Sequence, residues 1–361
     1  MLFPHSHRTR NLHTISVTCL GLLIVTFSGC LPTTPIEPFS VESVSLPEMP
    51  SRPTGKAMAG STALRFNVSL PVELGQPGEA SQVVVLMPSK KPQLKLPCLV
   101  YTPAGSPLFA GMQLTQQDEM QMLPYVQMGF AVVCYETDGG AQALTPQTPP
   151  KEMAELARKY VASKAGLVNA RNAITWALRC FEEIDKTKMY AIGHSSGGKQ
   201  ALLLAAHDTR IRGCVAFAPA CKMDSSIGRL IRSWPVEDPD QLVTEVRRSV
   251  PMSHSDRIQV PCLLIHSHND RIVRSSEVQR MGQAIGSESE ITEVDSEDHF
   301  DIPQVGFVTA AKWLQKHTGL ESDDSIDPIR PVSLPAKSPT PVRRTNVRHN
   351  SGDVQYNPYL Q

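Results

Sequence analysis

The sequence lacks the marks of several protein classes. No apolar run reaches the roughly 20 residues that a membrane-spanning helix needs. Aromatic residues make up only 6% of the chain, which argues against stacking platforms for bases or sugars. The 35 basic side chains equal the 35 acidic ones, so the charge gives no reason to expect nucleic acid as a partner. What remains is a chain of 361 residues, 41% of them hydrophobic, which is enough to bury a large core.

The first 29 residues have the pattern of an export signal. Two arginines lie in a polar start, an apolar stretch covers residues 15–27, and two small residues precede Cys30. This ending resembles the lipobox of bacterial lipoproteins. The resemblance implies cleavage before Cys30, an exported protein of the bacterial cell envelope, and a lipid on Cys30 as its only contact with a membrane. An ordinary secretory signal that happens to end in cysteine is the alternative.

Two proline-rich segments flank one foldable region. Residues 30–55 contain six prolines and few large apolar side chains, which predicts an extended linker because proline fixes φ and removes a hydrogen-bond donor. Residues 321–361 are rich in proline and charge without hydrophobic periodicity, which predicts a disordered tail. One domain is therefore expected over residues 56–320.

Within this domain, predicted strands and helices alternate. Short apolar runs that suit strands buried on both faces recur along the chain, and helical patterns lie between them. We expect a mostly parallel sheet flanked by helices, with a long insertion at about residues 220–258 that caps a site. The expected strands are 82–87, 96–102, 130–135, 188–192, 213–217, 260–266 and 290–294. The expected helices are 167–181, 197–207, 277–285 and 306–317.

A Gly-x-Ser-x-Gly motif lies between a predicted strand and a predicted helix. It reads Gly193-His194-Ser195-Ser196-Gly197. A serine on a sharp strand-to-helix turn needs neighbours without Cβ, because the strand and the helix approach each other closely there. The turn would lift the Ser195 hydroxyl to the carboxyl edge of the sheet, which predicts a nucleophile. A simple Gly/Ser turn is the alternative.

A serine nucleophile needs a base, and the base needs an acid that orients it. Asp270 and His299 follow the last two predicted strands, in the chain order serine, acid, histidine that this arrangement requires. Since the carboxyl ends of parallel strands meet at one edge, we expect the three side chains to converge. Asp295 and Asp298 are rival acids, but both lie too close in sequence to His299 to approach it from another strand.

An oxyanion hole would need backbone N–H donors. The first is expected from Ser196, the residue after the nucleophile. The second is expected from the loop that follows the strand 96–102, with Ser106 favoured and Gly105 as second choice.

These residues together resemble the α/β-hydrolase superfamily, closest to dienelactone-hydrolase-like and bacterial cutinase-like esterases. His299-Phe300 followed by a helix with Trp313 adds to the similarity, which covers roughly residues 60–318. The resemblance implies an α/β-hydrolase fold and a serine hydrolase without a cofactor. Dienelactone hydrolases proper use cysteine as nucleophile, so Ser195 points away from their substrate.

A metal site is the competing interpretation of one segment. His266-x-His268-x-Asp270 matches the start of a metallo-hydrolase pattern, and imidazole and carboxylate suit zinc. The next position of that pattern is Arg271, and a cation beside a metal is unfavourable. We therefore expect no metal.

The sequence as a whole predicts an envelope serine hydrolase that cleaves a small-molecule or polymeric carboxylic ester. Two alternatives remain: a serine peptidase of the same fold, and a binding lipoprotein that keeps the fold without catalysis. The sequence does not indicate an oligomeric state.

Overall fold

The computed structural model describes residues 37–320, except 81, 141–143 and 145–146. The described residues form a nine-stranded sheet in the order β1-β2-β3-β5-β4-β6-β7-β8-β9. The pairs among β1, β2, β3 and β5 are antiparallel, and every pair from β5 to β9 is parallel. The strands are β1 (Lys56–Ala57), β2 (Ala63–Ser69), β3 (Gln82–Pro88), β4 (Leu96–Tyr101), β5 (Ala131–Tyr135), β6 (Ile184–His194), β7 (Ile211–Phe217), β8 (Cys262–His266) and β9 (Ser289–Glu293).

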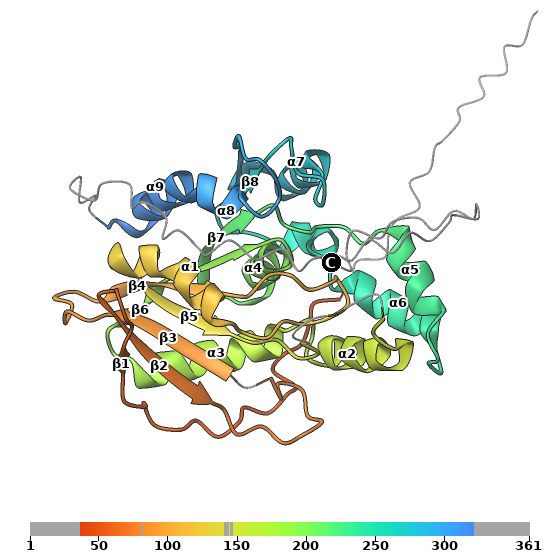
Figure 1. Cartoon of the computed structure of the whole chain (residues 1–361), viewed down its shortest axis with the longest axis horizontal. Helices are drawn as coiled ribbons and strands as arrows, with labels where there is room; N and C mark the ends of the chain where they lie inside the picture. Colours follow the sequence, from red (N-terminus) through yellow and green to blue (C-terminus); the bar gives the residue numbers. More distant parts are fainter. Residues whose placement is uncertain (1–36, 81, 141–143, 145–146, 321–361) are drawn as a thin grey trace, which may run out of the picture. The chain divides into compact units, whose positions relative to one another are not determined.

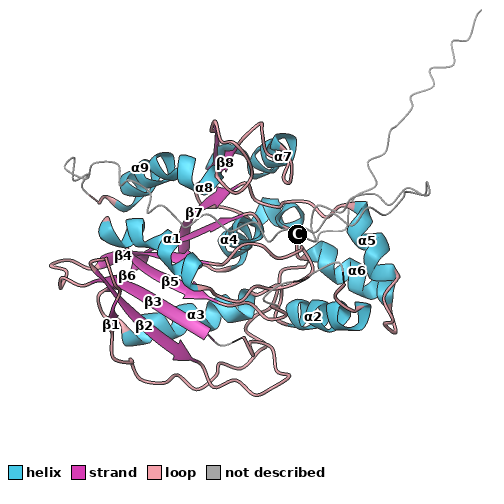
Figure 2. Cartoon of the chain, viewed as in Figure 1, coloured by secondary structure: helices cyan, strands magenta, loops and turns pink. Residues whose placement is uncertain are grey.

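Helices cover both faces of this sheet (Figures 1 and 2). Helices α1 and α9 lie on one face, where the rings of Tyr125 and Phe307 pack edge to face with centroids 5.0 Å apart. Helices α3 and α4 lie on the other face and contact each other. The helices are α1 (Gln116–Gln127), α2 (Pro150–Ala162), α3 (Leu167–Cys180), α4 (Ser196–His207), α5 (Ser225–Arg232), α6 (Pro239–Arg248), α7 (Ser275–Ile285), α8 (Ile302–Val305) and α9 (Phe307–Thr318), with short 3₁₀ turns η1 (Pro251–Arg257) and η2 (Gly286–Glu288).

The predicted strands are confirmed to within a few residues, and so are the predicted helices. Every residue of β4, β5 and β8 is buried, because helices cover the sheet on both sides. Strands β1 and β2 and helices α1, α2, α5, α6 and α8 were not predicted from the sequence. Helix α1 carries Pro124 in its interior, which argues against a helix in any local pattern, yet Thr115 caps its N-terminus and buried side chains hold it on the sheet.

The connections around β4 create the crevice of the fold. From β4 the chain passes through α1 to β5 on one side, and later through α3 to β6 on the other side. Loops after β4 and β6 therefore leave the same sheet edge in opposite directions, and ligands bind at such a point in open parallel sheets. The Gly-x-Ser-x-Gly turn follows β6, and the loop expected to supply an oxyanion donor follows β4.

Part of the predicted linker lies against the domain. The Arg171 guanidinium of α3 donates hydrogen bonds to three backbone carbonyls of residues 41–45, at 2.5–3.2 Å. The indole N–H of Trp176, also on α3, donates to the Pro50 carbonyl at 2.9 Å. Residues 41–50, here called the docked segment, thus accept hydrogen bonds from two side chains of α3 without forming a strand or helix of their own.

The predicted insertion contains α5, α6 and η1. The indole of Trp234, which follows α5, packs edge to face on Phe109 with ring centroids 5.0 Å apart. Phe109 belongs to the loop after β4, so the insertion contacts the loop that borders the crevice. Among the described helices, none is both long and apolar enough to cross a membrane.

Candidate active site

Ser195 occupies a strained turn between β6 and α4. Its φ of 53° and ψ of −117° lie in a backbone region that residues other than glycine rarely adopt. The turn is tight: a Cβ atom on Gly193 would lie 2.3 Å from the Gly197 carbonyl oxygen, and one on Gly197 would lie 2.3 Å from the Thr102 carbonyl oxygen. The Ser195 N–H donates to the Phe217 carbonyl of β7 at 2.8 Å, which fixes the turn to the neighbouring strand. The glycines are therefore required by close backbone approach.

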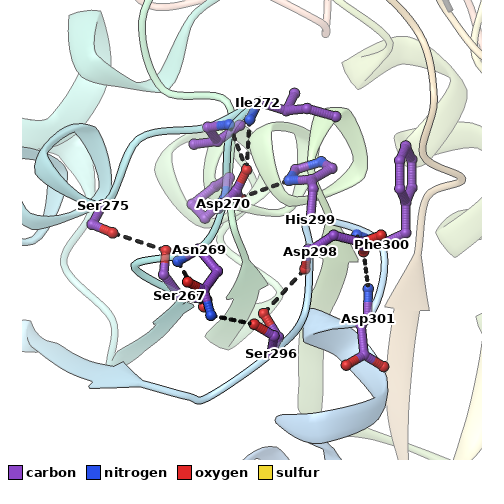
Figure 3. Close-up of polar contacts among 12 residues, drawn as sticks. Ser267, Asn269, Asp270, Ile272, Ser275, Ser296, Asp298, His299, Phe300 and Asp301 are labelled. Carbon is purple, nitrogen blue, oxygen red and sulfur yellow. Dashed lines mark hydrogen bonds and ion pairs between the residues drawn. The ribbon is translucent and has the colours of Figure 1, made fainter.

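Asp270 and His299 form a buried pair beside this turn (Figure 3). His299 Nδ1 lies 2.7 Å from Asp270 Oδ2, and the two residues are 3% and 6% exposed. Asp270 Oδ1 accepts the backbone N–H groups of Ile272 and Val273 at 2.8 and 2.9 Å. Because the carboxylate accepts the Nδ1 proton, a neutral imidazole in this position carries no proton on Nε2 and could accept one there.

The His299 imidazole packs on the residue that precedes Ser195. The rings of His194 and His299 have centroids 4.5 Å apart. Burial, and then the neighbouring His299, lower the pKa of His194 to about 3, so its ring is neutral at physiological pH. The fold thereby brings His299 from beyond β9 to the end of β6.

Phe300 borders the same pair on its open side. Its ring packs edge to face on His299 with centroids 5.4 Å apart, and 69% of the residue is exposed. Figure 3 shows His299 between Asp270 and Phe300. An apolar surface is thus available to a ligand directly beside the imidazole.

The two loop donors that the sequence analysis named both contact the side chain of Ser196. The N–H groups of Gly105 and Ser106 donate to Ser196 Oγ at 3.1 and 3.2 Å. The structure thus brings the three residues expected to form the oxyanion hole close together. The two loop N–H groups, however, donate to the Ser196 hydroxyl. The Ser196 N–H belongs to the first turn of α4, where helix geometry offers it no acceptor.

Lys199 is a site residue that the sequence analysis missed. It is 2% exposed, lies one turn into α4, and its Nζ donates to the Leu108 carbonyl at 3.2 Å. The ammonium also lies 4.6 Å from the centroid of the Tyr160 ring. Burial lowers the pKa of Lys199 to about 7. A lysine four residues after the motif serine gives no local signal of burial, because the segments that cover it, the loop after β4 and helix α2, lie far away in sequence.

The rival acid Asp298 and the histidines of the competing metal pattern have other partners. Asp298 Oδ1 caps the turn after it by accepting the N–H groups of Phe300 and Asp301. His266 and His268 both face Glu293, with Nδ1 atoms 4.0 and 3.0 Å from its carboxylate, while Asp270 faces His299. Within the described ranges, no group of three or more His, Cys, Asp or Glu side chains is arranged to hold a metal ion.

Comparison with known families decides the assignment. A model described as the dienelactone hydrolase family matches residues 109–296, which is more than half of the 361 residues. The chain belongs to the dienelactone hydrolase family. The match includes Ser195 and Asp270 and ends just before His299. Family membership confirms the resemblance inferred from the motif, and it establishes the chain as a member of a hydrolase family.

Solved structures with the same fold include several esterases. Acetyl xylan esterase 1 from Thermoanaerobacterium sp. JW/SL YS485 is 18% identical, with a TM-score of 0.54, and the match covers 74% of this chain and 87% of that one. Acetyl xylan esterase from Paenibacillus sp. R4 is 16% identical, with a TM-score of 0.55 and coverage of 74% and 88%. A cold-adapted esterase from an Arctic intertidal metagenomic library is 13% identical, with a TM-score of 0.51 and coverage of 75% and 100%. Such likenesses show the fold of this family member. A search of curated proteins found no match.

Proposed function

We propose that this dienelactone hydrolase family member is a serine hydrolase that cleaves carboxylic esters through an acyl-enzyme. Ser195 is the nucleophile, His299 the general base and acid, and Asp270 the group that orients His299. The observation that carries the proposal is the strained φ of Ser195 beside a histidine whose Nδ1 proton is held by a buried carboxylate.

The steps follow from the positions of these groups. His299 accepts the hydroxyl proton as Ser195 Oγ bonds to the ester carbonyl carbon, and the carbonyl oxygen becomes an oxyanion. His299 then returns the proton to the alcohol oxygen as the C–O bond breaks, which leaves an acyl-serine. Water attacks the acyl-serine by the same route, with His299 as base, and releases the acid. Asp270 stabilises the imidazolium during each tetrahedral stage.

Labelling with a fluorophosphonate tests the nucleophile. We expect mass spectrometry to find the label on Ser195, and expect Ser195→Ala to lower the turnover of p-nitrophenyl acetate by several orders of magnitude. The His299→Ala variant should lose the label as well. A Ser195→Ala variant with full esterase activity would reject the mechanism.

The bond that is cleaved is tested by a substrate panel. We expect p-nitrophenyl esters to be hydrolysed and aminoacyl nitroanilides to be spared. The proposed ester specificity is supported by the two acetyl xylan esterases that share this fold. Preference for the anilides would instead favour the peptidase. An acylaminoacyl peptidase that is 12% identical to this chain has the same fold, so this alternative is included in the panel. Folded protein that takes no label at Ser195 would favour a binding lipoprotein.

We further propose that the mature protein is anchored by a lipid on Cys30, which lies outside the described residues. Expression in a bacterial host with a radiolabelled fatty acid should label the wild type and leave Cys30→Ala unlabelled. Release of unlabelled wild-type protein into the soluble fraction would favour an ordinary secretory signal.

A further inference from the structure

The Ser196 hydroxyl has an unusual set of partners. A serine hydroxyl has two acceptor lone pairs and one proton to donate. Both acceptor positions of Ser196 Oγ are filled, by the N–H groups of Gly105 and Ser106 at 3.1 and 3.2 Å. The proton is the part of this group that stays available for a further partner.

In the part of the chain that the structure describes, the Ser196 hydroxyl donates no hydrogen bond. Ser196 is only 5% exposed, which leaves little room for bulk water as a partner. Buried hydroxyl groups are nearly always hydrogen-bonded, because an unsatisfied buried donor is costly. The geometry therefore indicates an acceptor that arrives from outside the chain.

The position of Ser196 shows which acceptor this is. It follows Ser195 directly and starts α4, so its backbone N–H and its hydroxyl both belong to the edge where a bound carbonyl would meet the nucleophile. Ordered N–H groups at a helix start also favour a negative charge.

We propose that the Ser196 hydroxyl is a catalytic group of this enzyme, donating its proton in a hydrogen bond to the oxyanion of the tetrahedral intermediate. The inference rests on the proposed ester hydrolysis and deepens it. Gly105 and Ser106 act through Ser196: their N–H groups fix the hydroxyl and polarise it, so that it donates more strongly. The Ser196 N–H is the second donor to the same oxygen.

Two other arrangements of the Ser196 hydroxyl predict that its removal leaves catalysis unchanged. In the first, a substrate displaces the Ser196 side chain, and the Gly105 and Ser106 N–H groups bind the oxyanion themselves. In the second, the hydroxyl donates to a buried water in the cavity of about 10 Å³ that Ser196 lines with Thr102 and Lys199, a space of about one water. Neither arrangement needs the Ser196 hydroxyl for catalysis.

The test compares Ser196→Ala with wild type, using p-nitrophenyl acetate as substrate and a trifluoromethyl ketone, whose serine adduct carries an oxyanion. We expect kcat to fall roughly 10- to 1,000-fold with KM little changed, because the lost hydrogen bond forms only in the transition state. The inhibition constant of the ketone should rise by about the same factor as kcat/KM falls. Ser196→Cys is nearly isosteric with a weaker donor, so its kcat should also fall, which keeps the test valid if the alanine variant does not fold.

Ser289→Ala is the control, since its hydroxyl donates to carbonyls at the end of α7, at the opposite end of β9 from the site. This variant should leave kcat and the inhibition constant of the ketone unchanged. Wild-type or higher kcat in folded Ser196→Ala, or a lower kcat with unchanged ketone affinity, would overturn the inference and leave the proposed function intact. Wild-type protein without fluorophosphonate labelling at Ser195 would overturn both.

Discussion

The Asp270 carboxylate contacts His299 through one oxygen and is fixed through the other. Oδ2 accepts from His299 Nδ1 at 2.7 Å, while Oδ1 accepts two backbone N–H groups of the turn after β8. The turn thus determines the orientation of the carboxylate, and the carboxylate determines the orientation of the imidazole. A backbone turn therefore positions an imidazole that comes from a separate loop beyond β9.

Asp270→Asn should lower kcat by about 10²- to 10⁴-fold, since an amide can present its NH₂ to Nδ1 and favour the wrong tautomer. Steady-state kinetics with p-nitrophenyl acetate measure the effect. Asp298→Asn is the matched control, because Asp298 caps backbone N–H groups through an oxygen that asparagine retains. A larger loss in Asp298→Asn than in Asp270→Asn would identify the wrong acid.

Gly197→Ala should destabilise the domain by about 1–3 kcal/mol or more, because the new Cβ would lie 2.3 Å from the Thr102 carbonyl oxygen. Urea unfolding followed by circular dichroism measures the change. In Gly228→Ala, a helical glycine of α5 whose nearest neighbouring atom would lie 3.5 Å away, stability should rise by up to about 1 kcal/mol. Equal changes in stability for Gly197→Ala and Gly228→Ala would contradict the close approach of α4 to the Thr102 carbonyl.

Lys199 should make stability depend on pH. Burial lowers its pKa from 10.5 to about 7, so between these values the unfolded chain binds one more proton than the folded chain. The free energy of unfolding contributed by Lys199 therefore rises as the pH increases from 7 to 10.5. Urea unfolding from pH 6 to pH 10 should show wild type gaining stability relative to Lys199→Met.

Lys186→Met serves as the control for this pH series, because Lys186 is exposed on β6. The stability of Lys186→Met relative to wild type, measured over the same pH range, is the baseline for the comparison. A difference between wild type and Lys199→Met that stays constant from pH 6 to pH 10 would show that the Lys199 pKa is not lowered.

Arg171→Met should release the docked segment, because three backbone carbonyls of residues 41–45 lose their donor. Hydrogen exchange or limited proteolysis should show faster exchange or cleavage around these residues. Arg179→Met changes an exposed arginine on the same helix and should leave the segment protected. Equal protection in both variants would mean that other contacts hold the segment.

Much of the fold could be read from local sequence. Apolar runs such as 98–100 and 262–265 mark strands buried on both faces, and the Gly-x-Ser-x-Gly spacing marks the turn whose φ at Ser195 is 53°. These features are local, since periodicity and glycine content act within a few residues. Helix α1, with its internal Pro124, was missed because tertiary packing overrides local preference there.

Only the tertiary structure decided what these elements touch. The adjacency of β4 and β6 brings the Gly105 and Ser106 N–H groups to Ser196 Oγ, about 90 residues away in sequence, and the same loop buries Lys199. The docking of residues 41–50 on α3 likewise depends on a distant arginine. The sequence determined which groups reach the carboxyl edge of the sheet, because strand direction is a local consequence of strand and helix order. It could not determine the partner of the Gly105 and Ser106 N–H groups, because a hydrogen bond depends on distances of a few tenths of an ångström between chain segments whose relative positions only packing sets.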